Sequence, residues 1–361
     1  MSVLERKLVQ KNNLVNGFLL GSVAMAVAGV AIAQAPGGQA KAGASRASTQ
    51  PKAGAAAEEK FDGQVFHAQV LLDRAGFSPG VIDGMVGTSF THALEGFQEA
   101  RGLQTTGQLD QATRAALLRD RAPSSVTLRI AESDAQGPFT PIPKEPEQQA
   151  KMERLAYRNL LEKLAEKFHT TPATVIALNR PDMVLKAGTV LRLPNVLPAS
   201  RSYAGVKSDV AQLLSDLNIS GTQPKADRVV VDKSDKVVRV LGEDGKLLAQ
   251  FPATLGSVKD PLPLGNWKVN SIAYNPPFKY QPKLFWDVSD DKKEQMLPPG
   301  PNGPVGLVWI DLNKEHIGIH GTNSPETIKR AESHGCVRLT NWDAARLTQM
   351  IGNGTPVVFQ A

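Results

Sequence analysis

Residues 317–339 read IGIHGTNSPETIKRAESHGCVRL and contain the only cysteine of the chain, Cys336. Apolar residues alternate before His320, which predicts a β-strand that ends at this histidine. Gly335 separates His334 from Cys336 and predicts a tight turn. A thiol becomes a nucleophile when an imidazole takes its proton and the two are held as thiolate and imidazolium. The stretch therefore predicts a nucleophilic cysteine at the end of a turn, in a domain built from strands.

Two imidazoles compete for the role of base to Cys336. We favour His320, because a side chain at a strand end can reach a facing loop. The backbone carbonyl of Gly321 is the candidate partner for its second ring nitrogen. The turn itself would aim backbone N–H groups at one point, so those of His334, Gly335 and Cys336 are the candidate oxyanion hole.

Two other interpretations of Cys336 are possible besides a catalytic role. Cys336 can be a buried apolar filler, as free cysteines often are. Alternatively, His316, His320, His334 and Cys336 supply four side chains that bind zinc. His316 precedes a strand, however, in which three intervening residues separate it from His320 by more than about 10 Å. We therefore expect neither a metal nor another cofactor.

The chain on both sides of this stretch has the two-residue period of a β-sheet. Predicted strands lie at 229–231, 237–241, 247–251, 267–269, 307–312, 317–320 and 356–359, and a helix at about 342–350. We expect a mainly-β catalytic domain over 226–361, a sandwich or barrel with few helices. Its long loop at 274–306 is a candidate lid, because loops of this length inside a domain are usually functional or disordered.

The N-terminus has the pattern of an export signal. Basic residues precede an apolar run at about 18–32, and Ala31-Ile32-Ala33 has the small-x-small pattern of a cleavage site. We expect a signal peptide over 1–33 and a flexible linker over 34–60, with an uncleaved membrane anchor as the alternative. The formal net charge is +6, which suits a polyanionic wall better than nucleic acid. The expected location is the periplasm or cell wall.

Residues 61–120 have helical periodicity, with glycines at the turns and Asp110 as a helix cap. The stretch resembles the three-helix peptidoglycan-binding domain. The resemblance is carried by Ile82-Asp83-Gly84, Gly87, Ala93-Leu94, Phe97-Gln98, Gly102-Leu103, Gly107, Asp110 and Thr113. It implies a small all-α domain that binds the wall, whereas the glycines and aspartates of the signature equally serve as turns and caps.

The region between these domains is less regular. Residues 121–150 are rich in proline and polar residues and predict a second linker. Residues 151–197 contain two predicted helices, the second capped by Thr171 with Pro172 at its first turn, and then a strand. This stretch resembles a LysM module, a small α+β glycan-binding fold. The usual opening strand is missing before Leu160, so we interpret the module as degenerate and as a glycan binder or a brace.

Residues 227–360 resemble the catalytic domain of the L,D-transpeptidases, the YkuD-like family. The resemblance rests on His320-Gly321-Thr322, on Ser333 to Leu339, and on Asn341, Asp343 and Leu347. It implies a β-sandwich with Cys336 as nucleophile, His320 as base and the turn at 334–336 as oxyanion hole. It also assigns Ser333, Thr322, Trp286 and Arg338 to substrate binding. Arg338 would hold a substrate carboxylate, or alternatively form an ion pair with Asp343.

The resemblance implies acyl transfer on peptidoglycan stem peptides. Cys336 would attack the diaminopimelate–D-alanine bond of a tetrapeptide, and an amine would then take the acyl group. The amine belongs to another stem peptide, giving a 3→3 cross-link, or to a wall-anchored lipoprotein. Water as acceptor would make the enzyme an L,D-carboxypeptidase, and a catalytically inactive wall-binding protein is the third reading. Carbapenems would target the same thiol.

Overall fold

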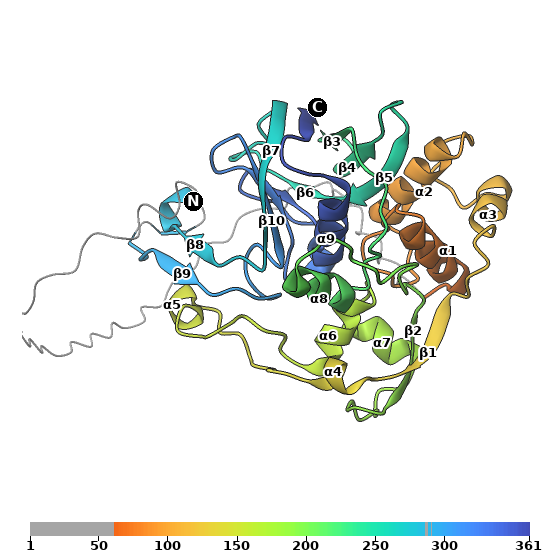
Figure 1. The fold of residues 1–361 in the computed structure, drawn as a ribbon, viewed down its shortest axis with the longest axis horizontal. Coiled ribbons are helices and arrows are strands. Elements are labelled where there is room, and N and C mark those ends of the chain that lie inside the picture. The colour runs from red at the N-terminus through yellow and green to blue at the C-terminus, as the bar shows by residue number, and fades with distance from the viewer. Residues whose placement is uncertain (1–60, 286–287, 290) are drawn as a thin grey trace, which may run out of the picture. The chain divides into compact units, whose positions relative to one another are not determined.

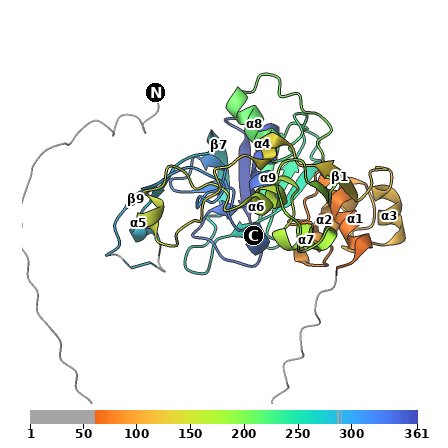
Figure 2. The same cartoon turned by 90° about the horizontal axis from the view of Figure 1, so that it is seen from below.

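The β-rich region after residue 226 forms a nine-stranded sheet in the computed structural model, which describes residues 61–361 except 286, 287 and 290. The expected signal peptide and first linker, 1–33 and 34–60, therefore lie outside the described residues, as does Trp286. All described residues belong to one compact unit (Figures 1 and 2). Within them, no helix is long and apolar enough to cross a membrane.

The sheet has the order β5-β4-β3-β13-β7-β10-β11-β12-β6. Its edge strands β5 and β6 are joined in the chain by Ala253 alone, so the sheet curves back on itself. The predicted strands are confirmed, and the short β6 and β12 are additional. The bounds are β3 (Arg228–Asp232), β4 (Val237–Leu241), β5 (Leu247–Pro252), β6 (Thr254–Leu255), β7 (Gly265–Tyr274), β10 (Val308–Leu312), β11 (Gly318–His320), β12 (Val337–Arg338) and β13 (Pro356–Gln360).

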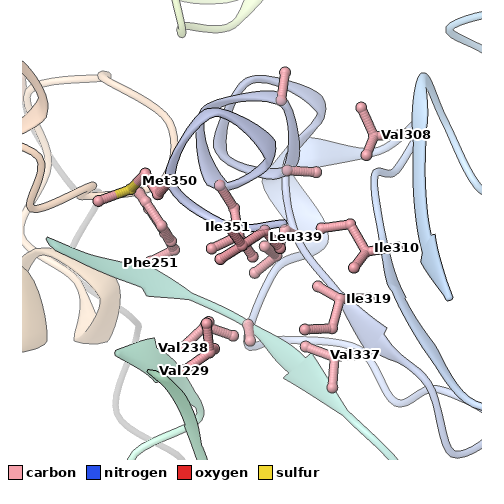
Figure 3. Close-up of a cluster of buried hydrophobic side chains, with 14 of the residues drawn as sticks. Val229, Val238, Phe251, Val308, Ile310, Ile319, Val337, Leu339, Met350 and Ile351 are labelled. Carbon is pink, nitrogen blue, oxygen red and sulfur yellow. The ribbon is translucent and has the colours of Figure 1, made fainter. Parts of the chain in front are cut away.

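One helix, α9 (Asn341–Met350), packs against β10 and β11 and fills the concave side of the sheet. Trp342 and Leu347 have no exposed surface, and the core side chains in Figure 3 come from strands on both sides of β7. Thr340 caps the helix by accepting a hydrogen bond from Asp343 N at 3.1 Å. Each fully buried aliphatic side chain contributes about 1.5–3 kcal/mol, so this core fixes the strand that carries His320.

The predicted three-helix domain is confirmed. Its helices are α1 (Gly63–Arg74), α2 (Thr88–Ala100) and α3 (Gln111–Leu117). Asp110 caps α3 by accepting from Thr113 N at 2.8 Å, as the sequence predicts. The domain packs on the edge strand β5, where Gln250 Nε2 donates to His92 O at 2.6 Å. The helical domain and the sheet therefore share a packed interface.

The prediction of a second linker over 121–150 is wrong for its first part. The segment begins with β1 (Ser125–Arg129), which pairs antiparallel with β2 (Val190–Pro194). Val126, Leu128 and Ile130 alternate with polar residues, but the proline-rich sequence that follows conceals this short strand. A short strand, β1, therefore precedes Leu160 in the chain.

A segment of residues 136–159, here called the excursion, separates β1 from the two predicted helices of this module. The helices are α6 (Leu160–Lys167) and α7 (Pro172–Leu178), and Thr171 caps α7 as predicted. The order of β1, α6, α7 and β2 is strand, helix, helix, strand, and the identity of this middle module as LysM-like stays a prediction. Further helices are α4 (Glu132–Ala135), α5 (Pro146–Gln149) and α8 (Ser208–Asp216).

The long loop at 274–306 contains a small hairpin. Its strands β8 (Phe278–Tyr280) and β9 (Gln295–Leu297) pair antiparallel, with a 3₁₀ turn, η1 (Pro282–Leu284), between them. Helix α5 of the excursion lies beside β9 (Figures 1 and 2). A second 3₁₀ turn, η2 (Pro325–Thr327), lies between His320 and Cys336 in the chain.

Candidate active site

His320 is the last residue of β11 and is buried, with 5% of its surface exposed. Its ring stacks on Trp309, its neighbour in β10, with centroids 5.5 Å apart. His320 Nδ1 lies 2.7 Å from the backbone oxygen of Gly321. A carbonyl oxygen can only accept, so Nδ1 carries the proton and Nε2 has a free lone pair. This tautomer is the one that a general base needs.

Cys336 directly precedes β12, which runs parallel to β11. The register pairs Ile319 with Val337 and His320 with Arg338, so Cys336 and His320 are diagonal neighbours on adjacent strands. Gly335 has φ +88°, a conformation that favours glycine, and it turns the chain into the strand. The predicted Gly-hinged turn is therefore present. It places Cys336 just before β12, with its Sγ 3.5 Å from the backbone oxygen of His316.

Two buried hydroxyls hold the turns around this pair. Ser333 Oγ donates to the carbonyl of Cys336 at 2.6 Å, and Thr322 Oγ1 accepts from Ser324 N at 3.2 Å. Ser333 is 3% exposed and Thr322 is 2% exposed. Their hydroxyls thus brace the chain, and substrate contact by either residue stays a prediction.

The electrostatics of the pair favour the neutral forms. Burial raises the pKa of the Cys336 thiol, and a backbone hydrogen bond from Gly318 and the charge of Arg338 oppose this rise. Burial and the nearby Arg338 lower the pKa of His320 to about 3, against the opposing effect of its bond to Gly321. Thiol and imidazole are therefore both uncharged near neutral pH, and the thiolate–imidazolium form considered from the sequence is not the resting state.

Arg338 brings a buried positive charge next to the thiol and imidazole. Its Nε is buried without a hydrogen-bond partner among the described residues. The ion pair with Asp343 that the sequence allows is absent. Asp343 Oδ2 instead accepts from Ser78 Oγ at 2.7 Å. A buried donor without a partner costs free energy, so this guanidinium is suited to an anionic group of a bound molecule.

His334 faces the β8–β9 hairpin. The ring of Phe285, which follows η1, meets the His334 ring edge-on with centroids 4.8 Å apart, and Tyr280 of β8 stacks on Phe285 at 5.5 Å. The predicted lid thus contacts the turn that carries the nucleophile. Trp286, predicted to touch substrate, is outside the described residues.

No three His, Cys, Asp or Glu side chains converge as a metal site among the residues described. His316 has φ +61°, and its side chain is 64% exposed beside Glu315. It lies beyond the start of β11, at the opposite end from His320.

Two residues near the site carry contacts that sequence reasoning missed. Asn341 Nδ2 donates to Glu166 Oε1 at 2.7 Å, and Asn341 Oδ1 accepts from Leu307 N at 2.9 Å. Asn341 was part of the family signature, without a role. Glu166 had no signal, because it lies in an amphipathic helix where a glutamate is ordinary.

Comparison with known families separates the chain into two matched regions. Residues 226–359 match the YkuD family, described as "L,D-transpeptidase catalytic domain", and residues 62–117 match PG_binding_1, described as "Putative peptidoglycan binding domain". These ranges lie close to the expected domains 226–361 and 61–120.

Individual relatives agree with this division. The chain is 29% identical over 130 residues to the "Putative L,D-transpeptidase YkuD" of Bacillus licheniformis, which covers 36% of the chain and 63% of the relative. Identity with the protein of the same name from Bacillus subtilis is 49% over 57 residues, covering 16% and 35%. The chain therefore spans less than two thirds of the length of either relative.

Among solved structures, an L,D-transpeptidase from Mycobacterium smegmatis is 24% identical, with a TM-score of 0.31, over 37% of this chain and 58% of that one. The two sequence matches decide the assignment. Residues 226–359 are an L,D-transpeptidase catalytic domain of the YkuD family, and residues 62–117 are a peptidoglycan-binding domain of the PG_binding_1 family.

Proposed function

We propose that the protein is a peptidoglycan L,D-transpeptidase with Cys336 as nucleophile and His320 as base. The observation that carries the proposal is the locked tautomer of His320. Its Nδ1 is bound to Gly321 O at 2.7 Å, which leaves Nε2 ready to take a proton, and Cys336 precedes the adjacent strand.

The first half-reaction acylates the enzyme. Cys336 Sγ attacks the carbonyl carbon between the L-centre of diaminopimelate and the terminal D-alanine, and its proton passes to His320 Nε2. The N–H groups of Gly335 and Cys336, with that of His334, stabilise the oxyanion. The C–N bond then breaks, His320 returns the proton to the leaving amine, and D-alanine departs from a thioester.

The second half-reaction transfers the acyl group. An acceptor amine attacks the thioester and gives its proton to His320, and the C–S bond breaks as the thiol is re-formed. A stem-peptide amine yields a 3→3 cross-link, and a lipoprotein lysine yields protein anchoring. Water must be kept out for either product, and the hairpin that touches His334 through Phe285 is placed to cover this side.

Arg338 supplies the substrate-binding charge. Its buried Nε has no partner among the described residues, and its register neighbour is His320. A carboxylate of the stem peptide satisfies this donor and neutralises the guanidinium. Peptidoglycan is the partner of both matched domains, and the proposed location is the cell wall or periplasm.

The test incubates purified protein with tetrapeptide muropeptides and analyses the products by mass spectrometry. We expect D-alanine release with a dimer of the cross-linked mass, and no release from Cys336→Ala. Tripeptide as the sole product would identify the enzyme as an L,D-carboxypeptidase. Equal release by wild type and Cys336→Ala, or none by wild type, would refute a cysteine enzyme.

A carbapenem provides an independent readout of the thiol. We expect a covalent mass increase in the wild-type protein and none in Cys336→Ala. Chain integrity is checked in both samples by the same intact-mass measurement.

A further inference from the structure

The amide of Asn341, the first residue of α9, lies in a notch between two glycine peptides. A Cβ on Gly306 or on Gly321 would collide with Asn341 Oδ1. The same oxygen accepts from Leu307 N at 2.9 Å, and Asn341 has no exposed surface. The amide is thus held tightly against the peptide that follows His320.

The nitrogen of this amide is bound by a residue outside the catalytic domain. Asn341 Nδ2 donates to Oε1 of Glu166 at 2.7 Å, and Glu166 belongs to α6 of the middle module. Tyr157, in the excursion, donates its hydroxyl to the second oxygen, Glu166 Oε2, at 2.6 Å. The carboxyl group of Glu166 therefore connects the middle module to the catalytic domain through its bond to Asn341, and to the excursion through its bond to Tyr157.

Burying the carboxyl group of Glu166 at this position costs free energy. Glu166 is 8% exposed, and burial raises its pKa to about 7, although its bonds to Tyr157 and Asn341 oppose the rise. An apolar side chain of similar size would pack here without the cost of burying a carboxyl group. Buried ionisable groups of this kind gather at functional sites.

The contacts continue from Asn341 to the catalytic base. Gly321 lies against Asn341 Oδ1, donates its N–H to Val308 O at 3.1 Å, and accepts from His320 Nδ1 at 2.7 Å. The orientation of the Gly321 carbonyl therefore sets the tautomer and the direction of the imidazole. A turn of the Asn341 amide would therefore disturb the Gly321 peptide against which it packs.

We propose that Glu166 is a positioning residue for the reaction at Cys336, because it fixes the Asn341 amide against the Gly321 peptide that orients His320. The inference rests on the proposed function for its kinetic consequence, whereas the orientation of His320 is a property of the folded chain alone. The middle module is then a part of the active site and not only an attachment to the wall.

The experiment compares Glu166→Ala, Glu166→Met and Glu166→Gln with the full-length wild type. Methionine keeps the length and bulk of the side chain without the acceptor oxygen. It therefore still tests the proposal if the alanine variant does not fold. Glutamine retains an acceptor oxygen for Asn341 Nδ2. Glu162→Ala is the matched control, because it removes a glutamate one turn away on α6 that bonds Arg158 N.

Two readouts are measured, namely the kcat and KM of D-alanine release and the NMR signals of the His320 imidazole. For alanine and methionine we expect kcat to fall about 10- to 100-fold with KM little changed, since small misplacement of a catalytic group has effects of this size. The Nδ1–H signal of His320 should shift or exchange faster. Glutamine should restore both readouts, and Glu162→Ala should alter neither.

An unchanged imidazole signal and unchanged kcat in folded Glu166→Met would overturn the proposal. Loss that glutamine does not restore would also count against it, because the acceptor would then not be the cause. A wild-type protein that releases no D-alanine refutes the proposed function instead, and the imidazole signals still decide whether Glu166 positions His320.

Discussion

At the scale of single residues, the resting state of the nucleophile follows from burial. The Cys336 thiol has a raised pKa, and His320 has a pKa lowered to about 3, so neither carries a charge near neutral pH. In the proposed reaction, proton transfer to His320 would then accompany attack on the substrate and would not precede it. Cysteine enzymes that hold a thiolate–imidazolium pair react with alkylating agents well below pH 7.

We predict that alkylation of Cys336 by iodoacetamide is slow at neutral pH and rises only above the ordinary thiol range near pH 9. Because the thiolate is the reactive form, the rate follows its fraction. The measurement is the alkylation rate from pH 5 to 10.5, by mass spectrometry. The same chain in denaturant is the control and should titrate at the ordinary value. An inflection below pH 7 in the folded protein contradicts the neutral pair.

Glu166 predicts a pH dependence of stability. Its folded pKa is about 7 against an ordinary 4.5, so the folded state holds the proton more tightly than the unfolded state. Its contribution is complete below pH 4.5 and is lost as pH rises through 7. The difference corresponds to about 3 kcal/mol. The groups that act on it are Tyr157, Asn341 and Glu162.

We therefore predict that Glu166→Gln gains stability relative to wild type as pH rises from 4.5 to 7.5, by up to about 3 kcal/mol. Urea unfolding at several pH values measures this difference, in which the other titrating groups cancel. Glu162→Gln, on the same helix, removes the weakest of these effects and should leave most of the pH dependence in place. Parallel curves for wild type and Glu166→Gln would mean that the carboxyl group titrates normally.

The roles of some of these residues can be predicted from the sequence and those of others cannot, for a physical reason. Cys336 and the His320–Gly321 pair lie in one short stretch, where a strand end and a glycine turn are local patterns. Glu166 and Asn341 are 175 positions apart in the chain. Their contact depends on how two domains pack, and no local periodicity encodes that.

At the scale of elements, the β8–β9 hairpin is the part of the catalytic domain that we propose covers the site and excludes water. Tyr280, Phe285 and His334 form a chain of ring contacts from the hairpin to the nucleophile turn. One such ring pair contributes about 0.5–1.5 kcal/mol, which is enough to hold a hairpin mostly closed.

We predict that Phe285→Ala raises the ratio of hydrolysed tripeptide to cross-linked dimer about 2- to 10-fold, because the closed hairpin loses one ring contact. Mass spectrometry of the products gives the ratio directly. Leu284→Ala is the matched control, since this neighbouring side chain is 46% exposed. A product ratio that is the same in both variants would show that the hairpin does not keep water out.

The elements themselves were largely predictable where their pattern was long. Strands such as β3, β4 and β5 are runs of five or six residues rich in apolar side chains, and α7 has both its cap and its first-turn proline. The five-residue β1 alternates apolar and polar residues, but the proline-rich sequence beside it favours a linker, and its partner β2 lies far along the chain. A strand of that length is specified mainly by its partner, which the sequence does not reveal.

At the scale of the whole molecule, one buried cluster joins all three described modules. Asp73 of α1 pairs with Arg346 of α9 at 3.0 Å and with His169 of the middle module at 3.1 Å. The His169 ring also stacks on Trp342, with centroids 5.1 Å apart. Burial alone would raise the pKa of Asp73, but Arg346 and His169 outweigh it and hold the pKa well below its usual range.

This cluster indicates that the modules form one packed unit and are not separate domains joined by flexible linkers. Each of the three side chains is at least 90% buried, and each has its partners in another module. Separating the modules would leave a carboxylate and a guanidinium buried without partners or newly exposed. The peptidoglycan-binding domain therefore packs in a fixed position against the catalytic domain.

We predict that Asp73→Asn destabilises the whole unit by about 3–5 kcal/mol, since the variant leaves the buried Arg346 guanidinium without the carboxylate that it pairs with. Wild type should unfold in a single calorimetric transition, and the variant should unfold at lower temperature or in separate steps. Asp182→Asn is the control, because that carboxylate is 77% exposed in its pair with Arg180. If Asp73→Asn melted like wild type, the cluster would not couple the modules, and capture and catalysis would be mechanically independent.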